Sequence, residues 1–192
     1  MAKSVVVVGV GALGSHLIQF VRNTSATFKI VDMDRTELKN VLSQFHAKTS
    51  VGKSKVLGLQ QTMNFLFGVK LDTIPYKLVE TNAKEILGKP DLIIDCLDNG
   101  KSRRILQDYV RSNNIPCLHG ALDANGSFGR ICWDESFVID DENVVGGATC
   151  EGGEHLPFIG IASTYLARSA QLFLKDGRKI GFQITPSGTI ST

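Results

Sequence analysis

The sequence has almost no net charge and no long apolar run, and both absences narrow the range of partners. Lys and Arg together number 21 against 19 Asp and Glu, a formal net charge of +2, which gives no overall electrostatic reason to bind nucleic acid or an anionic membrane. No apolar stretch reaches the roughly 18 residues that a membrane-spanning helix needs. Glycines interrupt the valine run at 5–8 too early for a signal peptide. We therefore expect a cytoplasmic protein that binds neither nucleic acid nor membrane.

Cysteine and proline are also scarce, whereas glycine is abundant. The four cysteines never form a C-x-x-C pair, so their spacing suggests neither a zinc site nor a disulfide framework, and we expect reduced thiols and no zinc. Five prolines stand against 19 glycines, three of which fall within the first 14 residues. With 43% hydrophobic and 21% charged residues, the composition is that of a globular protein, and we expect residues 1–192 to form a single domain.

Short apolar runs alternate with helix-like segments over the first 120 residues. The run at 5–8 is typical of a strand buried on both faces, and it leads through a glycine-rich turn into apolar residues at helical spacing. The alternation continues through predicted strands at 28–32, 67–74, 92–96 and 115–119 and predicted helices at 52–65, 81–87 and 102–111. This order predicts a Rossmann-like α/β fold, with a mostly parallel sheet, helices on both faces and a ligand crevice at the carboxyl ends of the strands.

The pattern changes from about residue 121. Segments 127–133 and 136–140 are predicted to pair as strands around a turn at 134–135, and residues 144–154 form a glycine-rich connection. A long helix at 156–174 and a hairpin of 180–184 with 188–191 follow. We therefore expect residues 121–192 to extend the core at 1–120 with antiparallel strands, a crossover loop, and a final helix and hairpin.

Gly9, Gly11 and Gly14 form a G-x-G-x-x-G sequence between the first predicted strand and the helix that follows it. Such glycines let the main chain approach a phosphate, whose charge is stabilised by free N–H groups at the helix N-terminus. Asp32 ends the second predicted strand, where a carboxylate can accept hydrogen bonds from ribose hydroxyls. Residues 1–120 are therefore predicted to be a nucleotide-binding core. These features do not separate a nicotinamide cofactor from ATP.

Four further motifs resemble those of one family. They are Val31-Asp32-Met33-Asp34, the pair Asn40 and Gln44, Gly52-Lys53-Ser54-Lys55, and Asp95-Cys96-Leu97-Asp98-Asn99. In this order and spacing the chain resembles the ThiF/MoeB/HesA superfamily, the ubiquitin-activating-type adenylyltransferases, in a minimal form. The resemblance runs from the first strand to the helix that begins near residue 156. A dehydrogenase has no reason to carry the lysine or the D-C-x-D-N cluster.

The resemblance implies an adenylyltransferase that uses ATP and Mg²⁺. Its substrate would be the C-terminal carboxylate of a small ubiquitin-like or sulfur-carrier protein, usually ending in Gly-Gly, or of a peptide, and its products an acyl adenylate and pyrophosphate. Carried over to this sequence, Lys55 supplies positive charge to the phosphates and Asp98 holds Mg²⁺. Asp34 contacts the ribose, and Asn40 and Gln44 complete the ATP site with the glycine loop. The family also implies a homodimer or a heteromeric partner.

Cys150 corresponds to the cysteine of the family's crossover loop, a thiol that receives the acyl group in some members. Glycines at 146–147 and 152–153 flank it, and a supple loop suits a nucleophile that must reach the adenylate. The acidic neighbours Glu151 and Glu154 oppose formation of a thiolate. A spectator cysteine is therefore the alternative.

Three departures from the family pattern affect the expected activity. Ser43 stands where the family's Asn-x-x-Arg-Gln motif has its arginine, and neither the N-terminal helix with a second arginine nor the zinc-binding C-x-x-C pairs of many relatives are found. Lost arginine contacts cost powers of ten in phosphoryl-type transfer. The candidates to replace them are Lys39, Lys48, Lys53, Arg103 and Arg104. Two alternatives stay open: a catalytically degenerate binding subunit of a heteromeric activating complex, and an NAD-dependent oxidoreductase.

Overall fold

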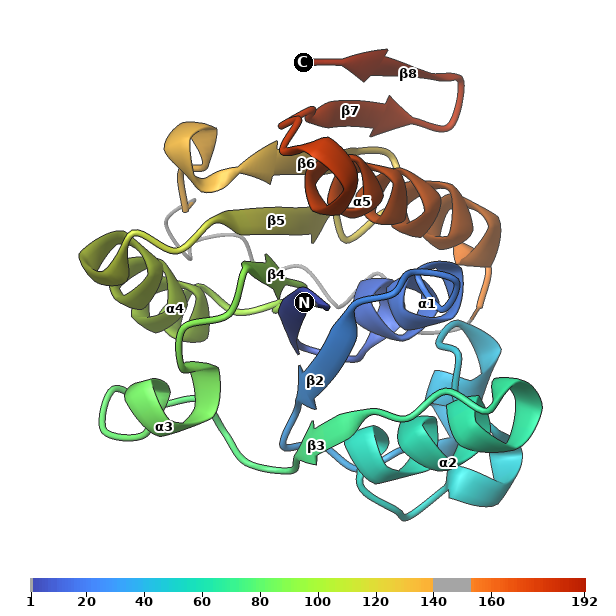
Figure 1. Ribbon diagram of the computed structural model, residues 1–192. Coiled ribbons are helices and arrows are strands. Elements are labelled where there is room, and N and C mark those ends of the chain that lie inside the picture. Colours follow the sequence, from blue (N-terminus) through green and yellow to red (C-terminus); the bar gives the residue numbers. More distant parts are fainter. Residues whose placement is uncertain (1, 140–152) are drawn as a thin grey trace.

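The computed structural model describes residues 2–139 and 153–192, and one eight-stranded sheet forms its centre (Figure 1). The strands lie in the order β3-β2-β1-β4-β5-β6-β7-β8. The first five of these positions are parallel, whereas β6, β7 and β8 are antiparallel to their neighbours. The strands are β1 (Ser4–Val8), β2 (Thr27–Val31), β3 (Asp72–Ile74), β4 (Leu92–Asp95), β5 (Cys117–Leu122), β6 (Gly129–Trp133), β7 (Phe182–Thr185) and β8 (Gly188–Ser191). The predicted Rossmann-like α/β fold with C-terminal antiparallel strands is confirmed.

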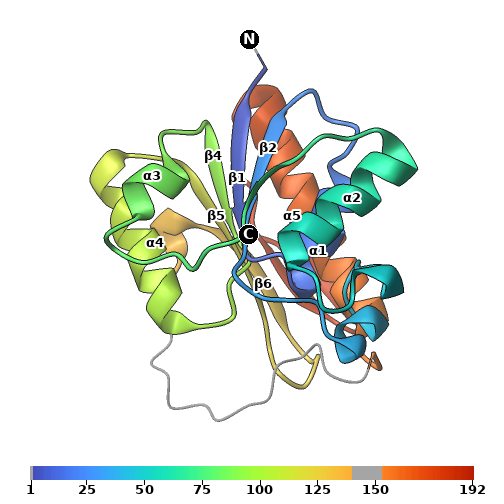
Figure 2. The ribbon, with the colours of Figure 1, turned by 90° about the horizontal axis from the view of Figure 1, so that it is seen from below.

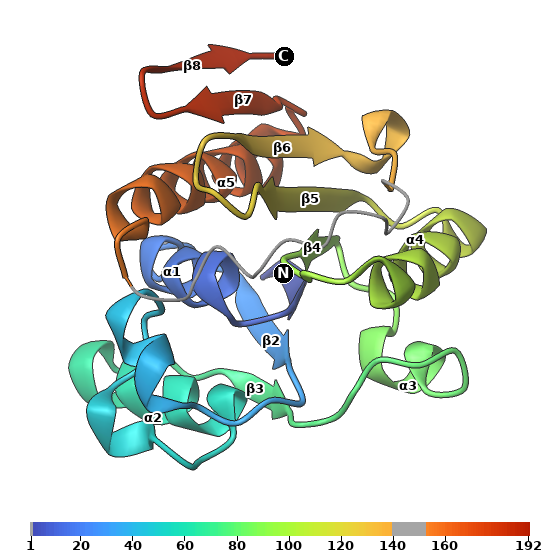
Figure 3. The ribbon, with the colours of Figure 1, turned by 180° about the vertical axis from the view of Figure 1, so that it is seen from behind.

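Helices cover both faces of the sheet (Figure 2). On one side lie α1 (Ala12–Phe20), α2 (Lys55–Phe67) and α5 (Leu156–Asp176), and on the other α3 (Ala83–Leu87) and α4 (Gly100–Asn113). Seen from behind, α5 runs beside α1 and packs against β5, β6 and β7, while the β7–β8 hairpin lies at the end of the sheet remote from β3 (Figure 3). Three short 3₁₀ helices, η1 (Leu38–Leu42), η2 (Lys48–Ser50) and η3 (Asp134–Ser136), complete the described elements.

Strand β1 shows why the parallel part of the sheet forms. Successive side chains of a strand point to opposite faces, and here Val5 and Val7 join the core under α1, α2 and α5, while Val6 and Val8 join the core under α3 and α4. All four are at most 3% exposed. An unbroken valine run therefore fits a strand that is covered on both sides.

Two predicted strands differ from the structure. The strand expected at 67–74 is shortened to β3, because α2 continues to Phe67 and ends at Gly68, whose φ of 67° is left-handed. The strand expected at 136–140 is wrong over its described residues: Asp134–Ser136 form η3, and β6 pairs with β5 and β7 instead. Phe137 then leaves the sheet direction to stack on the ring of His119, with ring centroids 4.0 Å apart. Burial of this aromatic ring decides the local path of the chain.

The site is positioned where the chain reverses its direction of travel across the sheet. From β1 the chain passes to β2 on one side, whereas β4 lies against β1 on the other. In open α/β sheets ligands bind at such a switch point, beyond the carboxyl ends of the strands. Among the described residues, no helix is both long and apolar enough to cross a membrane.

Candidate functional site

A cavity of about 1000 Å³ opens at the carboxyl ends of β1, β2, β4 and β5. Most of the residues predicted from the sequence line it: Gly9, Gly11, Asp32, Asp34, Asn40, Gln44, Lys55 and Asp98. Two predicted residues are not among them. Gly14 lies beneath the loop, and Cys150 is outside the described residues.

The three glycines of the loop have different structural roles. Gly9 has a φ of +89°, and a Cβ there would lie 2.6 Å from the main-chain oxygen of Cys96. A Cβ on Gly14 would lie 1.9 Å from the oxygen of Gly9, so Gly14 lets α1 pack against the turn. A Cβ on Gly11 would meet nothing nearer than Nε2 of Gln44 at 3.9 Å. Gly11 is therefore the position at which the loop leaves room for a ligand.

Asp32 ties the glycine loop to the end of β2. Its Oδ2 accepts a hydrogen bond from the N–H of Val10 at 2.8 Å, and its Oδ1 accepts one from the N–H of Asp34 at 2.8 Å. Burial raises the pKa of the Asp32 carboxyl, and it outweighs the opposite effects of Lys55 and of the two hydrogen bonds. The carboxylate thus shapes the loop and is also part of the cavity wall.

Lys55 begins α2 and forms an ion pair with Asp34. Its Nζ lies 3.0 Å from Oδ2 of Asp34, and its main-chain N–H donates to the oxygen of the same residue at 2.9 Å. The lysine side chain is 9% exposed and that of Asp34 is 51% exposed. The positive charge is therefore held in a fixed place in the cavity wall, next to a carboxylate that solvent or a ligand can reach.

Asn40 and Gln44 come from the 3₁₀ segment η1 and the residues just after it. Asn40 caps this segment, because its Oδ1 accepts from the N–H of Glu37 at 2.8 Å, and its main-chain oxygen accepts from the N–H of Gln44. Gln44 is 6% exposed, and its Oε1 is a buried atom with no partner in the part of the chain that the structure describes. A buried, unpaired polar atom in a cavity wall costs free energy until a ligand or water satisfies it.

Ser43 supplies no charge at the position of the family's arginine. Ser43 is 1% exposed, and its main-chain oxygen accepts a hydrogen bond from Nε2 of His16 at 3.2 Å. Of the cations considered as replacements, Lys39 and Arg103 line the cavity, whereas Lys48, Lys53 and Arg104 are not among its lining residues. Arg130 and Lys77, which sequence reasoning did not select, also line it.

Asp98 and Asn99 have different roles at the start of α4. Asn99 caps α4, because its Oδ1 accepts from the N–H of Ser102 at 2.9 Å. Asp98 is therefore not the cap. It is exposed at the edge of the cavity, where Nδ2 of Asn99 lies 3.4 Å from its Oδ1. A hard carboxylate oxygen in this place suits a divalent cation that also contacts phosphate.

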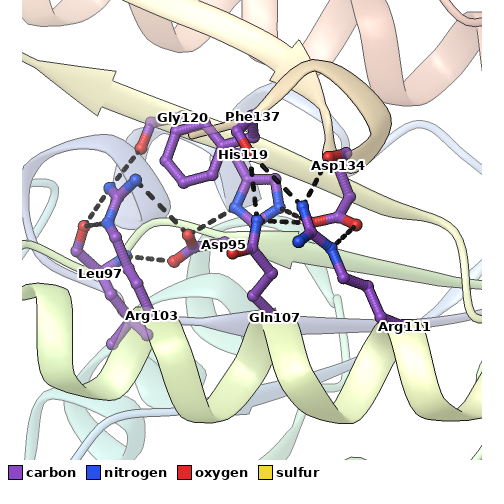
Figure 4. A network of polar contacts seen from close by, with 9 residues as sticks. All are labelled: Asp95, Leu97, Arg103, Gln107, Arg111, His119, Gly120, Asp134 and Phe137. Atoms are coloured by element: carbon purple, nitrogen blue, oxygen red, sulfur yellow. Dashed lines mark hydrogen bonds and ion pairs between the residues drawn. The ribbon is translucent and has the colours of Figure 1, made fainter. Parts of the chain in front are cut away.

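An ionic network that is buried except at Arg111 lies behind the cavity wall, and sequence reasoning missed most of it (Figure 4). His119 contacts Asp95 and Asp134, while Arg103 lies 3.5 Å from Asp95 and Arg111 lies 2.8 Å from Asp134. Arg103 donates to the main-chain oxygens of Leu97 and Gly120, so its guanidinium is already committed. An acidic residue at the end of the apolar run of β4 was the available signal, because charged residues are seldom fully buried without partners.

The described thiols are poor nucleophiles. Burial raises the pKa of Cys96, Cys117 and Cys132, which keeps these thiols protonated near neutral pH. No group of three or more His, Cys, Asp or Glu side chains is arranged to hold a metal ion within residues 2–139 and 153–192.

Curated proteins of known activity are similar to this chain. The adenylyltransferase and sulfurtransferase UBA4 of Meyerozyma guilliermondii is 31% identical over 174 residues, which is 85% of this chain and 41% of the relative. The sulfur carrier protein adenylyltransferase of Thermus thermophilus is 34% identical over 122 residues, 62% of this chain and 45% of the relative. The chain thus spans less than half the length of these relatives.

Solved structures share the fold at low sequence identity, and a family model matches most of the chain. Escherichia coli MccB in its complex with ATP superimposes with a TM-score of 0.78 at 13% identity, over 99% of this chain and 63% of that one. PaaA superimposes with a TM-score of 0.76 at 17% identity, over 99% of this chain and 62% of that one. The model of the ThiF family matches residues 1–143. On this match, the chain belongs to the ThiF family.

Proposed function

We propose that this chain binds MgATP in the cavity and adenylylates the C-terminal carboxylate of a small ubiquitin-like or sulfur-carrier protein, or of a peptide. One observation carries the proposal: Gly11, Lys55 and Asp98, from three separate segments, line one cavity at the sheet's switch point. The names of the relatives, which include a sulfur carrier protein adenylyltransferase and a SAMP-activating enzyme E1, support the reaction type.

The site is suited to a nucleotide. The cavity is at the upper end of the volumes usual for small-molecule sites. Gly11 leaves the main chain open to a phosphate at the N-terminus of α1, where free N–H groups stabilise negative charge. The unpaired Oε1 of Gln44 can accept a hydrogen bond from a ligand, or rotation of the amide can offer N–H donors to a phosphate oxygen.

The reaction is a substitution at the α-phosphorus of ATP. A carboxylate oxygen of the carrier forms a bond to this phosphorus, the bond to the oxygen bridging to the β-phosphorus breaks, and pyrophosphate leaves with the electron pair. Both reactants are anionic, so positive charge at the phosphates lowers the barrier. Lys55 is held for this role by Asp34 at 3.0 Å, and a phosphate oxygen can replace the partly exposed Asp34 as its partner.

Asp98 is the residue that would hold Mg²⁺. Its exposed carboxylate supplies a hard oxygen at the edge of the cavity. When bound, the ion supplies positive charge to phosphate oxygens. Asn99 fixes the start of α4 just after Asp98, so the chain that carries the carboxylate leads into a capped helix.

Cys150 accounts for the proposed second step. Its thiolate would attack the carbonyl carbon of the acyl adenylate, forming a thioester and releasing AMP, while the thiol proton passes to solvent. The proposal rests on the position of Cys150 in the sequence and on the protonated state of the three described thiols, which do not compete with it.

Exchange of labelled pyrophosphate into ATP, measured with candidate carriers ending in Gly-Gly, tests the first step. We expect carrier-dependent exchange that falls at least about a hundredfold in Lys55→Ala and Asp98→Ala, as when a charge-stabilising group is removed from an active site. Lys53→Ala is the matched control, because Lys53 contacts Gln61 and is not a cavity-lining residue. Exchange that persists in Lys55→Ala and Asp98→Ala would contradict the proposed roles.

The other outcomes identify the alternatives. ATP binding without exchange across the carriers would favour a catalytically degenerate binding subunit, for which the uncharged Ser43 is the specific observation. Tight NADH binding without ATP binding would favour an oxidoreductase.

The homodimer or heteromeric partner that the family implies is part of the proposal. Sedimentation of the chain with and without carrier measures the mass of the assembly.

A further inference from the structure

His119 lies between two carboxylates inside the protein (Figure 4). Its Nδ1 is 2.8 Å from Oδ2 of Asp95, and its Nε2 is 3.1 Å from Oδ1 of Asp134. The side chains of His119 and Asp95 are 0% exposed, and that of Asp134 is 13% exposed. Two strands bring the first pair together, because Asp95 of β4 lies directly opposite His119 of β5 in the register of the sheet.

The contacts hold the ring at both ends. Each ring nitrogen of His119 lies within hydrogen-bond distance of a carboxylate oxygen. Burial opposes the charge of Asp134, but hydrogen bonds from Arg111 and Gln107 lower the pKa of its carboxyl. Phe137 stacks flat on the imidazole, with 5° between the ring planes. The imidazole is thus held by two carboxyl groups and an aromatic face.

The network reaches Asp98 through Leu97. Oδ1 of Asp95 accepts from the N–H of Leu97 at 2.9 Å, and Nε of Arg103 donates to the oxygen of Leu97 at 2.9 Å. Both main-chain groups of the residue before Asp98 are therefore held from behind the cavity wall. Asp95 keeps its orientation because His119 and Arg103 bind its other oxygen.

We infer that His119 is a positioning residue for Asp98 and acts through Asp95 and Leu97. The inference rests on the proposed function, because it assigns the network to the carboxylate that would hold Mg²⁺. Residues behind metal ligands orient them, and their loss typically weakens metal binding about 10- to 100-fold. Asp134 anchors the other end of the imidazole to α4, because its Oδ1 also accepts from Nε2 of Gln107 at 2.8 Å.

Two conservative variants separate positioning from general support of the fold. The amide nitrogen of asparagine matches Nδ1 of histidine and can still donate to Asp95, whereas that of glutamine matches Nε2 and can donate only to Asp134. We expect His119→Gln to raise the Mg²⁺ concentration needed for half-maximal ATP binding about tenfold and His119→Asn to raise it less than about threefold. Binding is measured by calorimetry, so no carrier is needed. The affinity for ATP measured in EDTA, without Mg²⁺, should be the same in His119→Gln and His119→Asn.

The control variant is Tyr109→Phe, which loses a hydrogen bond from α4 to the oxygen of Gly88 outside the network. We expect it to leave the Mg²⁺ dependence unchanged. Equal shifts in the glutamine and asparagine variants, or no shift in either, would overturn the positioning role. If the unmodified chain still binds MgATP in that case, this part of the proposed function stands. Failure of the unmodified chain to bind MgATP would overturn both.

Discussion

A single methyl group added to Gly11 or to Gly14 should separate ligand binding from folding. At Gly14 the new carbon would lie 1.9 Å from the oxygen of Gly9, far inside any normal contact, and that oxygen is main chain and cannot rotate away. Helix α1 must shift, and overpacking of this kind costs about 3 kcal/mol. At Gly11 the nearest atom is 3.9 Å away, so we expect stability to change by only about 1 kcal/mol.

ATP affinity should show the opposite order: among the folded molecules, Gly11→Ala should bind ATP more weakly than Gly14→Ala. The carbon added at Gly11 projects into the cavity where the main chain would approach a phosphate, and we expect binding to weaken about tenfold or more. Urea denaturation measures the stability of each variant, and calorimetry at a temperature where both are folded measures the affinity. Gly68→Ala is not a suitable control, because its φ is +67°. Gly160→Ala is suitable, because a Cβ there meets nothing within 4 Å.

The reasoning would be refuted if Gly14→Ala were as stable as the unmodified chain, or if Gly11→Ala bound ATP with unchanged affinity. The first result would mean that the loop does not pack against α1 as described. The second would mean that the nucleotide phosphates do not approach the loop.

Three further predictions concern pH, capping and the thiol. Burial lowers the pKa of His46 to about 4, below the value of about 6.5 in an unfolded chain. The unfolded state therefore binds more protons between these values, and stability that is complete above pH 6.5 is lost as the pH falls. Between pH 7 and 4.5 the unmodified chain should lose about 2 kcal/mol more than His46→Gln in urea denaturation, and equal losses would contradict this. Asn99→Ala should lower stability by about 1 kcal/mol, because it removes the cap of α4. If Asp98→Ala lost more stability than Asn99→Ala, the cap would have to be assigned to Asp98. A reductant-sensitive adduct with the carrier, detected by mass spectrometry, should disappear in Cys150→Ser, and its persistence there would exclude this thiol.

The parallel half of the fold could be predicted because its signals are local. Each doubly buried strand is a continuous apolar run, and the glycine loop directly follows one of them. The path after β6 could not be predicted in this way. The segment at 137–139 is a short apolar run, but the stacking of Phe137 on His119 and the hydrogen bond that its carbonyl accepts from Gln107 decide its course. These contacts join residues that are far apart in the sequence.

The candidate site was predictable to a similar extent. Motif positions correctly brought Gly11, Lys55 and Asp98 to one cavity. The motif did not distinguish Gly14, which serves packing, from Gly11, which lines the cavity, because both fit the same pattern. His119 and Asp134 had no sequence signal as a pair, since their contact depends on strand pairing and on η3. The cytoplasmic location and the lack of zinc stay predictions.

Transfer of AMP to a carrier tests the central claim most directly. The chain is incubated with Mg²⁺, ATP labelled at the α-phosphate, and a small carrier ending in Gly-Gly, with the same carrier lacking those two glycines as the control. The account predicts label on the intact carrier that hydroxylamine releases, as it does from an acyl adenylate, and no label on the shortened one. Binding of ATP without any label on intact carriers from the same genome would contradict it.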